Sequence, residues 1–209
     1  PERSRPLHSG NPVRSESAAL PDPAERVRGR GQGLRLLVIG GSLGARVLNR
    51  TVPEAVARLH GELPVKVHHQ NGADEEPEVR ERYAMLGDAA RVEAFVDDMA
   101  AAYAWADLVV CRAGALTIAE LAAAGLPSIL VPYPHATDDH QTGNAAYLAS
   151  AGAAVLMPQP EFNATSLADE LQRMGGDRDG LLAMANRARE LALTDAARQV
   201  ARLCLEEAA

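Results

Sequence analysis

The stretch Leu34–Arg50, LRLLVIGGSLGARVLNR, decides the fold class of this 209-residue chain. A mainly apolar segment runs into a glycine-rich turn, GGSLG, and the sequence that follows has helical character. A glycine turn between a strand and a helix lets the backbone approach an anion, and the N–H groups of the helix start point toward it. The stretch is compatible with a dinucleotide site, a sugar-nucleotide site or a tight turn without a ligand.

The same alternation of apolar strands and helical segments continues along the chain. The predicted strands are Leu34–Ile39, Val65–His69, Val92–Phe95, Leu108–Cys111, Ser128–Val131 and Ala153–Met157. The predicted helices are Ala45–Leu59, Glu75–Leu86, Met99–Trp105, Leu116–Ala124, Gln141–Ala151, Leu167–Met174 and Leu181–Leu205, the last broken near Thr194. This order predicts an α/β fold, a Rossmann-like parallel sheet of about six strands with helices on both faces.

The domain organisation follows from composition. Residues 1–33 are rich in Pro, Arg, Ser and Gly and lack periodicity, so we expect an interdomain linker that is partly irregular. Residues 34–209 are expected to form one domain that ends in the C-terminal helices. The chain begins with Pro1, which favours a piece of a longer protein.

Bulk properties exclude several classes of protein. A content of 47% hydrophobic residues supports a real core, and a net charge of −7 argues against wholesale binding to nucleic acid. The two cysteines, Cys111 and Cys204, form no disulfide framework or metal pattern, which suits a reducing compartment. The sequence shows neither an apolar run of about 18 residues, as a membrane span requires, nor a signal peptide.

The predicted topology also predicts where a ligand binds. Open parallel sheets hold ligands beyond the carboxyl ends of their strands. Five separated segments should therefore meet at one edge of the sheet: residues 40–44, 70–72, 95–99, 112–117 and 132–141.

The glycine turn does not match the dinucleotide fingerprint. Gly41 and Gly44 fit the last two glycines of G-x-G-x-x-G, but Ile39 occupies the first position. The second strand ends in VHHQNG and offers no carboxylate for a ribose. A nicotinamide oxidoreductase is therefore disfavoured, whereas a phosphate cradle, to which Ser42 adds a hydroxyl, and a turn without a ligand both stay open.

Glu120 is the only charged residue between Arg112 and Asp138. Thr117 and Glu120 have the T-x-x-E spacing of a helix capping box, which gives the carboxylate a structural role. The alternative is that Glu120 faces the edge of the sheet and accepts hydrogen bonds from ligand hydroxyls. From the residues alone, the cap is favoured.

Two further polar segments have mainly structural interpretations. The loop Pro132–Ala145 contains several His and Asp residues, but their spacing matches no standard zinc pattern, so a solvated loop is favoured over a metal site. A polar ligand contact through Gln141 stays open. Asp97 and Asp98 precede a helix, where carboxylates favour the positive N-terminal end, so we expect a cap there. No Ser-His-Asp arrangement and no nucleophile is evident.

Several segments, taken together and in order from Gly10 to Leu156, resemble the MurG family of bacterial peptidoglycan glycosyltransferases. The segments are GNPVR, GGSLGARVLN, HHQNG, the long block FVDDMAAAYAWADLVVCRAGALTIAELAAAGLPSILVPYPHATDDHQTGNA, and AGAAVL. Members of this family transfer N-acetylglucosamine to lipid I to make lipid II. The resemblance implies a GT-B fold, of which this chain is the C-terminal, donor-binding domain. The acceptor site, the membrane-facing patch and the general base would lie in an N-terminal domain, so no catalytic residue is expected here.

The resemblance also implies a binding site for UDP-N-acetylglucosamine. The diphosphate would meet Ser42 and the turn from Gly41 to Gly44, and the backbone of Val96 would read the uracil edge. Glu120 would accept from the ribose, Gln141 would contact the sugar, and Arg14 would contact the nucleotide end. The helix start over the diphosphate and sugar would supply the remaining positions, Ala115, Leu116, Thr117, Ile118 and Ala119. No metal and no cofactor is implied. Leu43 and Ala113 depart from residues common in the family, Gln and Ser.

The expected partners are UDP-N-acetylglucosamine, an N-terminal acceptor domain and, in the complete enzyme, lipid I. The complete enzyme would be inverting, cytoplasmic, and peripheral on the inner membrane. Two alternatives remain, a donor-binding subunit of a two-subunit transferase and another UDP-sugar enzyme of related fold, such as an epimerase.

Overall fold

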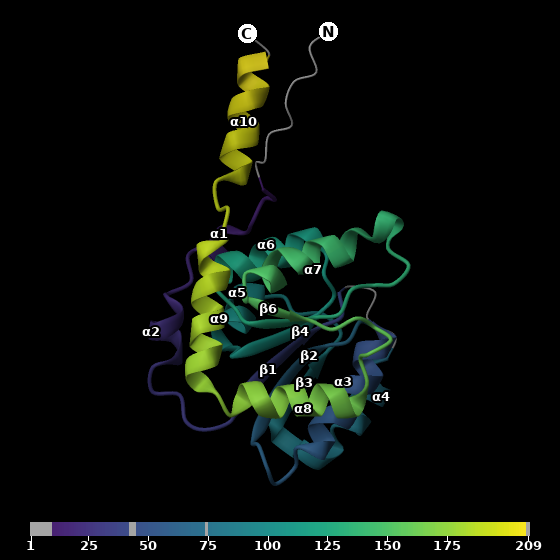
Figure 1. Ribbon diagram of the computed structural model, residues 1–209. Helices are drawn as coiled ribbons and strands as arrows, with labels where there is room; N and C mark the ends of the chain where they lie inside the picture. The colour runs from purple at the N-terminus through teal and green to yellow at the C-terminus, as the bar shows by residue number, and fades with distance from the viewer. Residues whose placement is uncertain (1–9, 42–44, 74, 208–209) are drawn as a thin grey trace.

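The computed structural model describes residues 10–41, 45–73 and 75–207, and these form one α/β unit around a parallel sheet (Figure 1). Its six strands follow the order β3-β2-β1-β4-β5-β6, and every neighbouring pair is parallel. The strands are β1 Leu34–Ile39, β2 Val65–Gln70, β3 Ala90–Glu93, β4 Leu108–Cys111, β5 Ser128–Leu130 and β6 Ala154–Leu156. The predicted Rossmann-like sheet of about six strands is confirmed.

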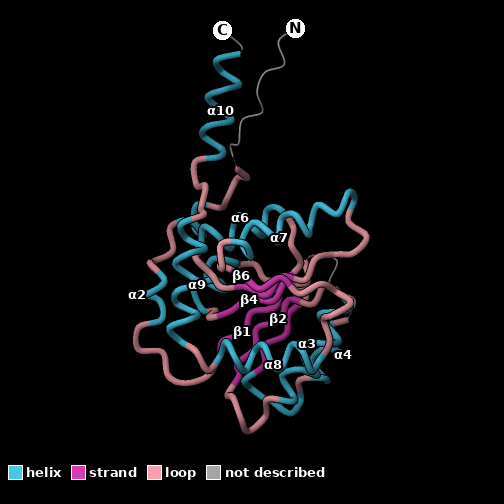
Figure 2. Tube along the Cα trace, in the orientation of Figure 1, coloured by secondary structure: helices cyan, strands magenta, loops and turns pink. Residues whose placement is uncertain are grey.

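Helices cover both faces of the sheet, which explains why the strands are almost continuously apolar (Figure 2). On one face a hydrophobic core unites alternate residues of β1 with α3 Arg46–Arg58, α4 Glu76–Arg82 and α8 Ala164–Gly175. On the other face a second core contains α5 Met99–Trp105, α6 Ala115–Ala124 and α7 His140–Ser150. The two faces of β1 divide accordingly, since Leu36 belongs to the first core and Leu37 to the second.

Several observed elements differ from the predicted ones. The helix predicted at Glu75–Leu86 is two elements, α4 and the 3-10 helix η1 Ala84–Ala89, which meet at Tyr83. The third strand occupies Ala90–Glu93, two residues before the predicted start, since its pairing with β2 begins at Val67 and Ala90.

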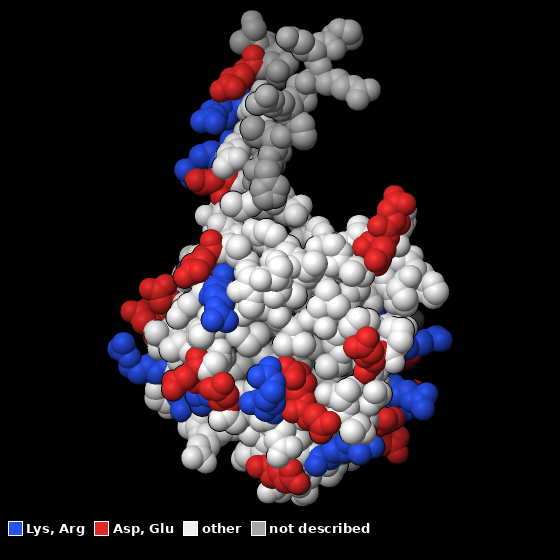
Figure 3. Space-filling view, viewed as in Figure 1, with Lys and Arg blue, Asp and Glu red and all other residues white. Residues whose placement is uncertain are grey.

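The C-terminal helices are separate, as predicted from the break near Thr194. α9 Arg178–Glu190 packs against α6 and α8, and α10 Ala196–Glu207 extends away from the body of the domain (Figure 1). Among the described residues, no helix combines the length and the hydropathy needed to cross a bilayer. Acidic and basic side chains are interspersed on the face drawn in Figure 3.

The segment before β1 carries structure that composition did not predict. Two short helices, α1 Ser15–Ala18 and α2 Pro23–Val27, pack against the domain. Arg30 then donates to the carbonyl of Ala106, at 2.9 Å, and forms an ion pair with Asp107, at 2.5 Å. The same buried carboxylate accepts from the backbone N–H of Arg35, at 3.0 Å, and pairs with Arg178, at 3.1 Å. This cluster joins the segment to the sheet and to α9.

Candidate functional site

The strand order reverses direction between β1 and β4, the two central strands. From β1 the chain enters α3 on one face, and from β4 it enters α6 on the other, so a crevice opens beyond their carboxyl ends. Ile39 and Cys111 are paired at the ends of these strands, so the chain leaves both strands at neighbouring points, at Gly40 and at Arg112. Gly41 has a φ of +81°, the left-handed conformation that a tight turn requires. Ser42, Leu43 and Gly44 lie outside the described residues.

The start of α6 presents backbone donors at this edge. Gly114 is its N-cap residue, and a glycine has no side chain that could form a capping hydrogen bond. Ala115 and Leu116 are exposed, whereas Ile118 points into the core, and Thr117 and Ala119 are half-buried. The first N–H groups of a helix have no partner within it, so α6 offers an anion site here.

The capping-box interpretation of Glu120 is wrong. The helix begins at Ala115, so Thr117 lies inside its first turn and cannot be the N-cap. The Glu120 carboxylate instead contacts two other elements. Its Oε1 lies 3.0 Å from Nη1 of Arg14, just before α1, and its Oε2 accepts a hydrogen bond from the hydroxyl of Tyr103 on α5, at 3.0 Å. The Glu120 side chain keeps 13% of its surface exposed, so a ligand can reach it.

Gln141 lies at the same edge, in the first turn of α7. Its Oε1 accepts from the backbone N–H of Ala113, at 3.2 Å, and from that of Tyr133, at 3.0 Å. Asn144, one turn later, donates to the carbonyl of Ala113, at 3.0 Å. These bonds attach α7 to the segments that follow β4 and β5. Because both partners of Oε1 are donors, the Gln141 amide nitrogen is the group that can donate to a ligand.

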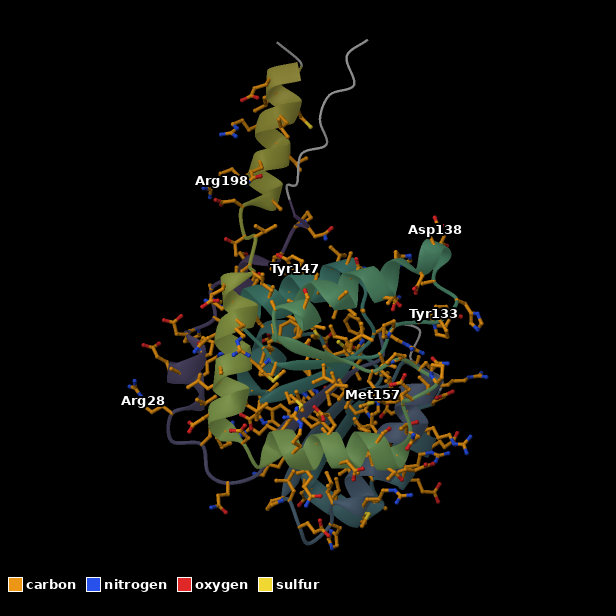
Figure 4. The ribbon with its side chains drawn as sticks, viewed as in Figure 1. Arg28, Tyr133, Asp138, Tyr147, Met157 and Arg198 are labelled. Carbon is orange, nitrogen blue, oxygen red and sulfur yellow. The ribbon has the colours of Figure 1, made fainter. Side chains whose placement is uncertain are left out.

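Arg112 also connects the segments that follow β4 and β5, and the sequence did not predict this role. Its guanidinium donates to the carbonyls of Val131 and Pro132, at 3.1 and 3.0 Å, and to Gln159, at 2.8 Å. The Tyr133 ring lies 5.4 Å from the guanidinium carbon. Burial lowers the pKa of Arg112. Figure 4 shows Tyr133 and Asp138 on the loop that projects beyond the sheet, with Asp138 directed into solvent.

Val96 forms another part of the edge, between β3 and α5. Its side chain is buried in the core, which leaves the backbone of this short loop as the group that a ligand can contact. Phe95 beside it is 57% exposed. Asp98 is the N-cap of α5 and accepts from the N–H of Ala101, at 2.9 Å, so the predicted capping role in this pair is confirmed.

A buried polar network joins β2 to α3 and α4. His69 at the end of β2 contacts the hydroxyl of Tyr83, at 3.0 Å, and Oδ1 of Asn49, at 3.1 Å. Asn49, in the second turn of α3, donates to the carbonyl of Asn71, at 3.0 Å, and to Glu75, at 2.7 Å. Burial lowers the pKa of His69 to about 3, so its ring is neutral and orients α3 through hydrogen bonds alone. Both adjacent histidines are buried, His68 at 7% and His69 at 0% exposed, and the network supplies the polar partners of His69.

Contacts join some of the predicted binding residues, and the topology of the sheet places others. Contacts link Arg14 with Glu120, and Gln141 with the turn before α6. Val96 and the turn at Gly41 occupy the same edge of the sheet through the topology. Within the part of the chain that the structure describes, no group of three or more His, Cys, Asp and Glu side chains could hold a metal ion.

Comparison with known proteins identifies the family. Residues 35–200 match the family described as Glycosyltransferase family 28 C-terminal domain. The chain belongs to this family. The match covers the sheet from Arg35 onward and all helices from α3 to α9, so every segment of the candidate edge except Arg14 lies inside it.

Two individual relatives are N-acetylglucosamine transferases by name. The UDP-N-acetylglucosamine--N-acetylmuramyl-(pentapeptide) pyrophosphoryl-undecaprenol N-acetylglucosamine transferase of Aeromonas hydrophila is 56% identical over 93% of the chain and 53% of its own length. The enzyme of the same name from Methylococcus capsulatus is 54% identical over 96% of the chain and 55% of its own length.

A solved structure agrees with these relatives. The crystal structure of Acinetobacter baumannii MurG superposes with a TM-score of 0.83 at 35% identity, over 91% of the chain and 55% of that protein. The predicted resemblance and the fold of a GT-B half are thereby confirmed. The chain spans about half the length of the curated relatives it matches.

Proposed function

We propose that this chain is the donor-binding domain of a lipid II-forming transferase and that it binds UDP-N-acetylglucosamine at the carboxyl edge of its sheet. The observation that carries the proposal is the position of Glu120, a reachable carboxylate on a helix whose first N–H groups have no acceptor within that helix. A ribose and a diphosphate require these two groups, a hydroxyl acceptor next to an anion site. Family membership and the relatives' names support the same donor.

Each part of the donor has a corresponding group along this edge. The diphosphate would lie over the N-terminus of α6 and the turn at Gly41, where backbone donors and the helix dipole offset its charge. The uracil edge would pair with the backbone of Val96, as nucleobases do with extended loops. The sugar would receive a hydrogen bond from the amide nitrogen of Gln141. Arg14 would contact the nucleotide end, since it already reaches the same carboxylate.

The reaction would require groups from the other half of the enzyme. The 4-hydroxyl of lipid I would attack the anomeric carbon with inversion, a base of the N-terminal half would take its proton, and UDP would leave. The donors described above would stabilise the charge on the departing diphosphate. The proposed partners are therefore UDP-N-acetylglucosamine, that N-terminal half and lipid I, and the complete enzyme would act on the cytoplasmic face of the inner membrane.

Calorimetry of a Glu120→Ala variant tests the proposal. The wild-type chain should bind UDP without added metal, in the presence of a chelator. Loss of a charged acceptor for ribose hydroxyls costs about 1.5–3 kcal/mol, so the affinity should fall about 10- to 150-fold. Asp169→Ala, which removes an exposed carboxylate from α8, is the matched control and should bind as the wild type does. If Glu120→Ala lowers the melting temperature but leaves the affinity for UDP unchanged, Glu120 is a structural residue only.

A further inference from the structure

Tyr103 lies behind the carboxylate that the proposed function assigns to the ribose. Its ring is buried on α5, 1% exposed, within the core that also contains Val96, Ile118 and Leu121. Its hydroxyl is the end that meets a polar partner, Oε2 of Glu120, at 3.0 Å. The main chain around it is also fixed, since the carbonyl of Tyr103 accepts from Arg26, at 3.4 Å.

We propose that Tyr103 is a positioning residue, which holds the Glu120 carboxylate in the orientation that recognises two adjacent hydroxyls of a ribose. The inference rests on the proposed function, because it concerns how the nucleotide's sugar is read. Tyr103 itself does not touch the ligand. It acts through Glu120, from the buried side of α6.

The two partners of Glu120 differ in how firmly they hold it. The Arg14 side chain is 58% exposed, and exposed ion pairs are weak because solvent screens them and the side chain loses entropy. Tyr103 is enclosed by packed side chains and cannot turn away without disrupting the core. A ligand can therefore replace Arg14 at Oε1 while Tyr103 keeps its contact with Oε2.

The hydrogen bond from Tyr103 has a defined direction. Burial raises the pKa of the Tyr103 hydroxyl well above its ordinary value of 10, so it stays protonated and donates to the carboxylate. An ionised carboxylate has about four acceptor positions, of which Tyr103 occupies one. With the carboxylate plane fixed, the free positions can accept from the 2′- and 3′-hydroxyls together. Without that bond, the carboxylate would rotate. The gain in affinity that a second ribose hydroxyl provides would then be smaller.

The test compares UDP with 2′-deoxy-UDP by calorimetry, for the wild type and for Tyr103→Phe. The phenylalanine ring preserves the packing and removes only the donor. In the wild type, UDP should bind about tenfold more tightly than the deoxy ligand, which corresponds to one lost hydrogen bond of about 1.4 kcal/mol. In Tyr103→Phe this ratio should fall to about threefold or less, with the affinity for the deoxy ligand nearly unchanged.

Two controls separate a positioning role from a structural one. Tyr147→Phe removes another tyrosine hydroxyl, which donates to the carbonyl of Leu191 at 3.0 Å, and should keep the wild-type ratio. In a Glu120→Ala background, Tyr103→Phe should change the affinity for UDP no further, because both act on one contact. Far-UV circular dichroism confirms that each variant is folded.

The outcomes are distinguishable. If the wild type does not bind UDP, the proposed function is refuted and this inference with it. If the wild type binds but Tyr103→Phe weakens UDP and 2′-deoxy-UDP equally, or weakens UDP further in the Glu120→Ala background, the positioning role is refuted and the proposed function stands. A Tyr103→Phe chain that does not fold also refutes it, because the tyrosine would then be a residue of the core alone.

Discussion

Acid should destabilise the fold through His69, the buried histidine near the end of β2. Burial lowers its pKa to about 3, whereas an unfolded chain has the ordinary value near 6.5. Between these two pKa values His69 binds a proton in the unfolded state but not in the folded state. The free energy of unfolding therefore falls as the pH falls below 6.5. From pH 7 to pH 5 the two values give a loss of about 2 kcal/mol in the free energy of unfolding from this group alone.

Urea unfolding, followed by circular dichroism at pH 7, 6 and 5, measures this loss. Glutamine does not titrate and can still donate and accept, so His69→Gln should have a pH dependence smaller by about 2 kcal/mol over this range. The other titrating residues are the same in both proteins. The matched control is His140→Gln, which replaces an exposed histidine and should keep the wild-type dependence. Equal pH dependence in His69→Gln and the wild type would refute a neutral buried ring.

Two further substitutions test the buried ion pair of Asp107 and the proposed sugar contact of Gln141. Asp107→Asn should lower the free energy of unfolding in urea by about 3 kcal/mol, because it leaves the guanidinium of Arg30 buried without its counter-charge, whereas Asp169→Asn on the exposed side of α8 should cost almost nothing. Gln141→Ala should reduce the advantage of UDP-N-acetylglucosamine over UDP in calorimetry, since it removes the donor to the sugar; an unchanged ratio would place the sugar elsewhere.

The sequence predicted the elements whose signal is local. Each strand is an apolar run between turn residues, so all six were found, and the break near Thr194 was found as well. α1 and α2 were missed because helices of four and five residues are too short to show periodicity. The third strand was misplaced because Ala90 and Arg91 are not apolar enough to mark its start, which pairing with β2 decides.

The site was predictable in position but not in its contacts. The predicted topology was enough to place five segments at one edge of the sheet. The spacing of Thr117 and Glu120 favoured a cap, and only the actual helix start at Ala115 shows that this is wrong. Tyr103 gave no signal, because its hydrogen bond to Glu120 joins two helices whose relative rotation depends on the packed core.

The central claim is that the carboxyl edge of this sheet binds a UDP-sugar. A crystal structure of the chain with UDP-N-acetylglucosamine tests it most directly. The account predicts a ribose within hydrogen-bond distance of Glu120, a uracil edge at the backbone of Val96, and a diphosphate over the start of α6. A nucleotide bound on another face of the domain, or with its ribose away from Glu120, would contradict it.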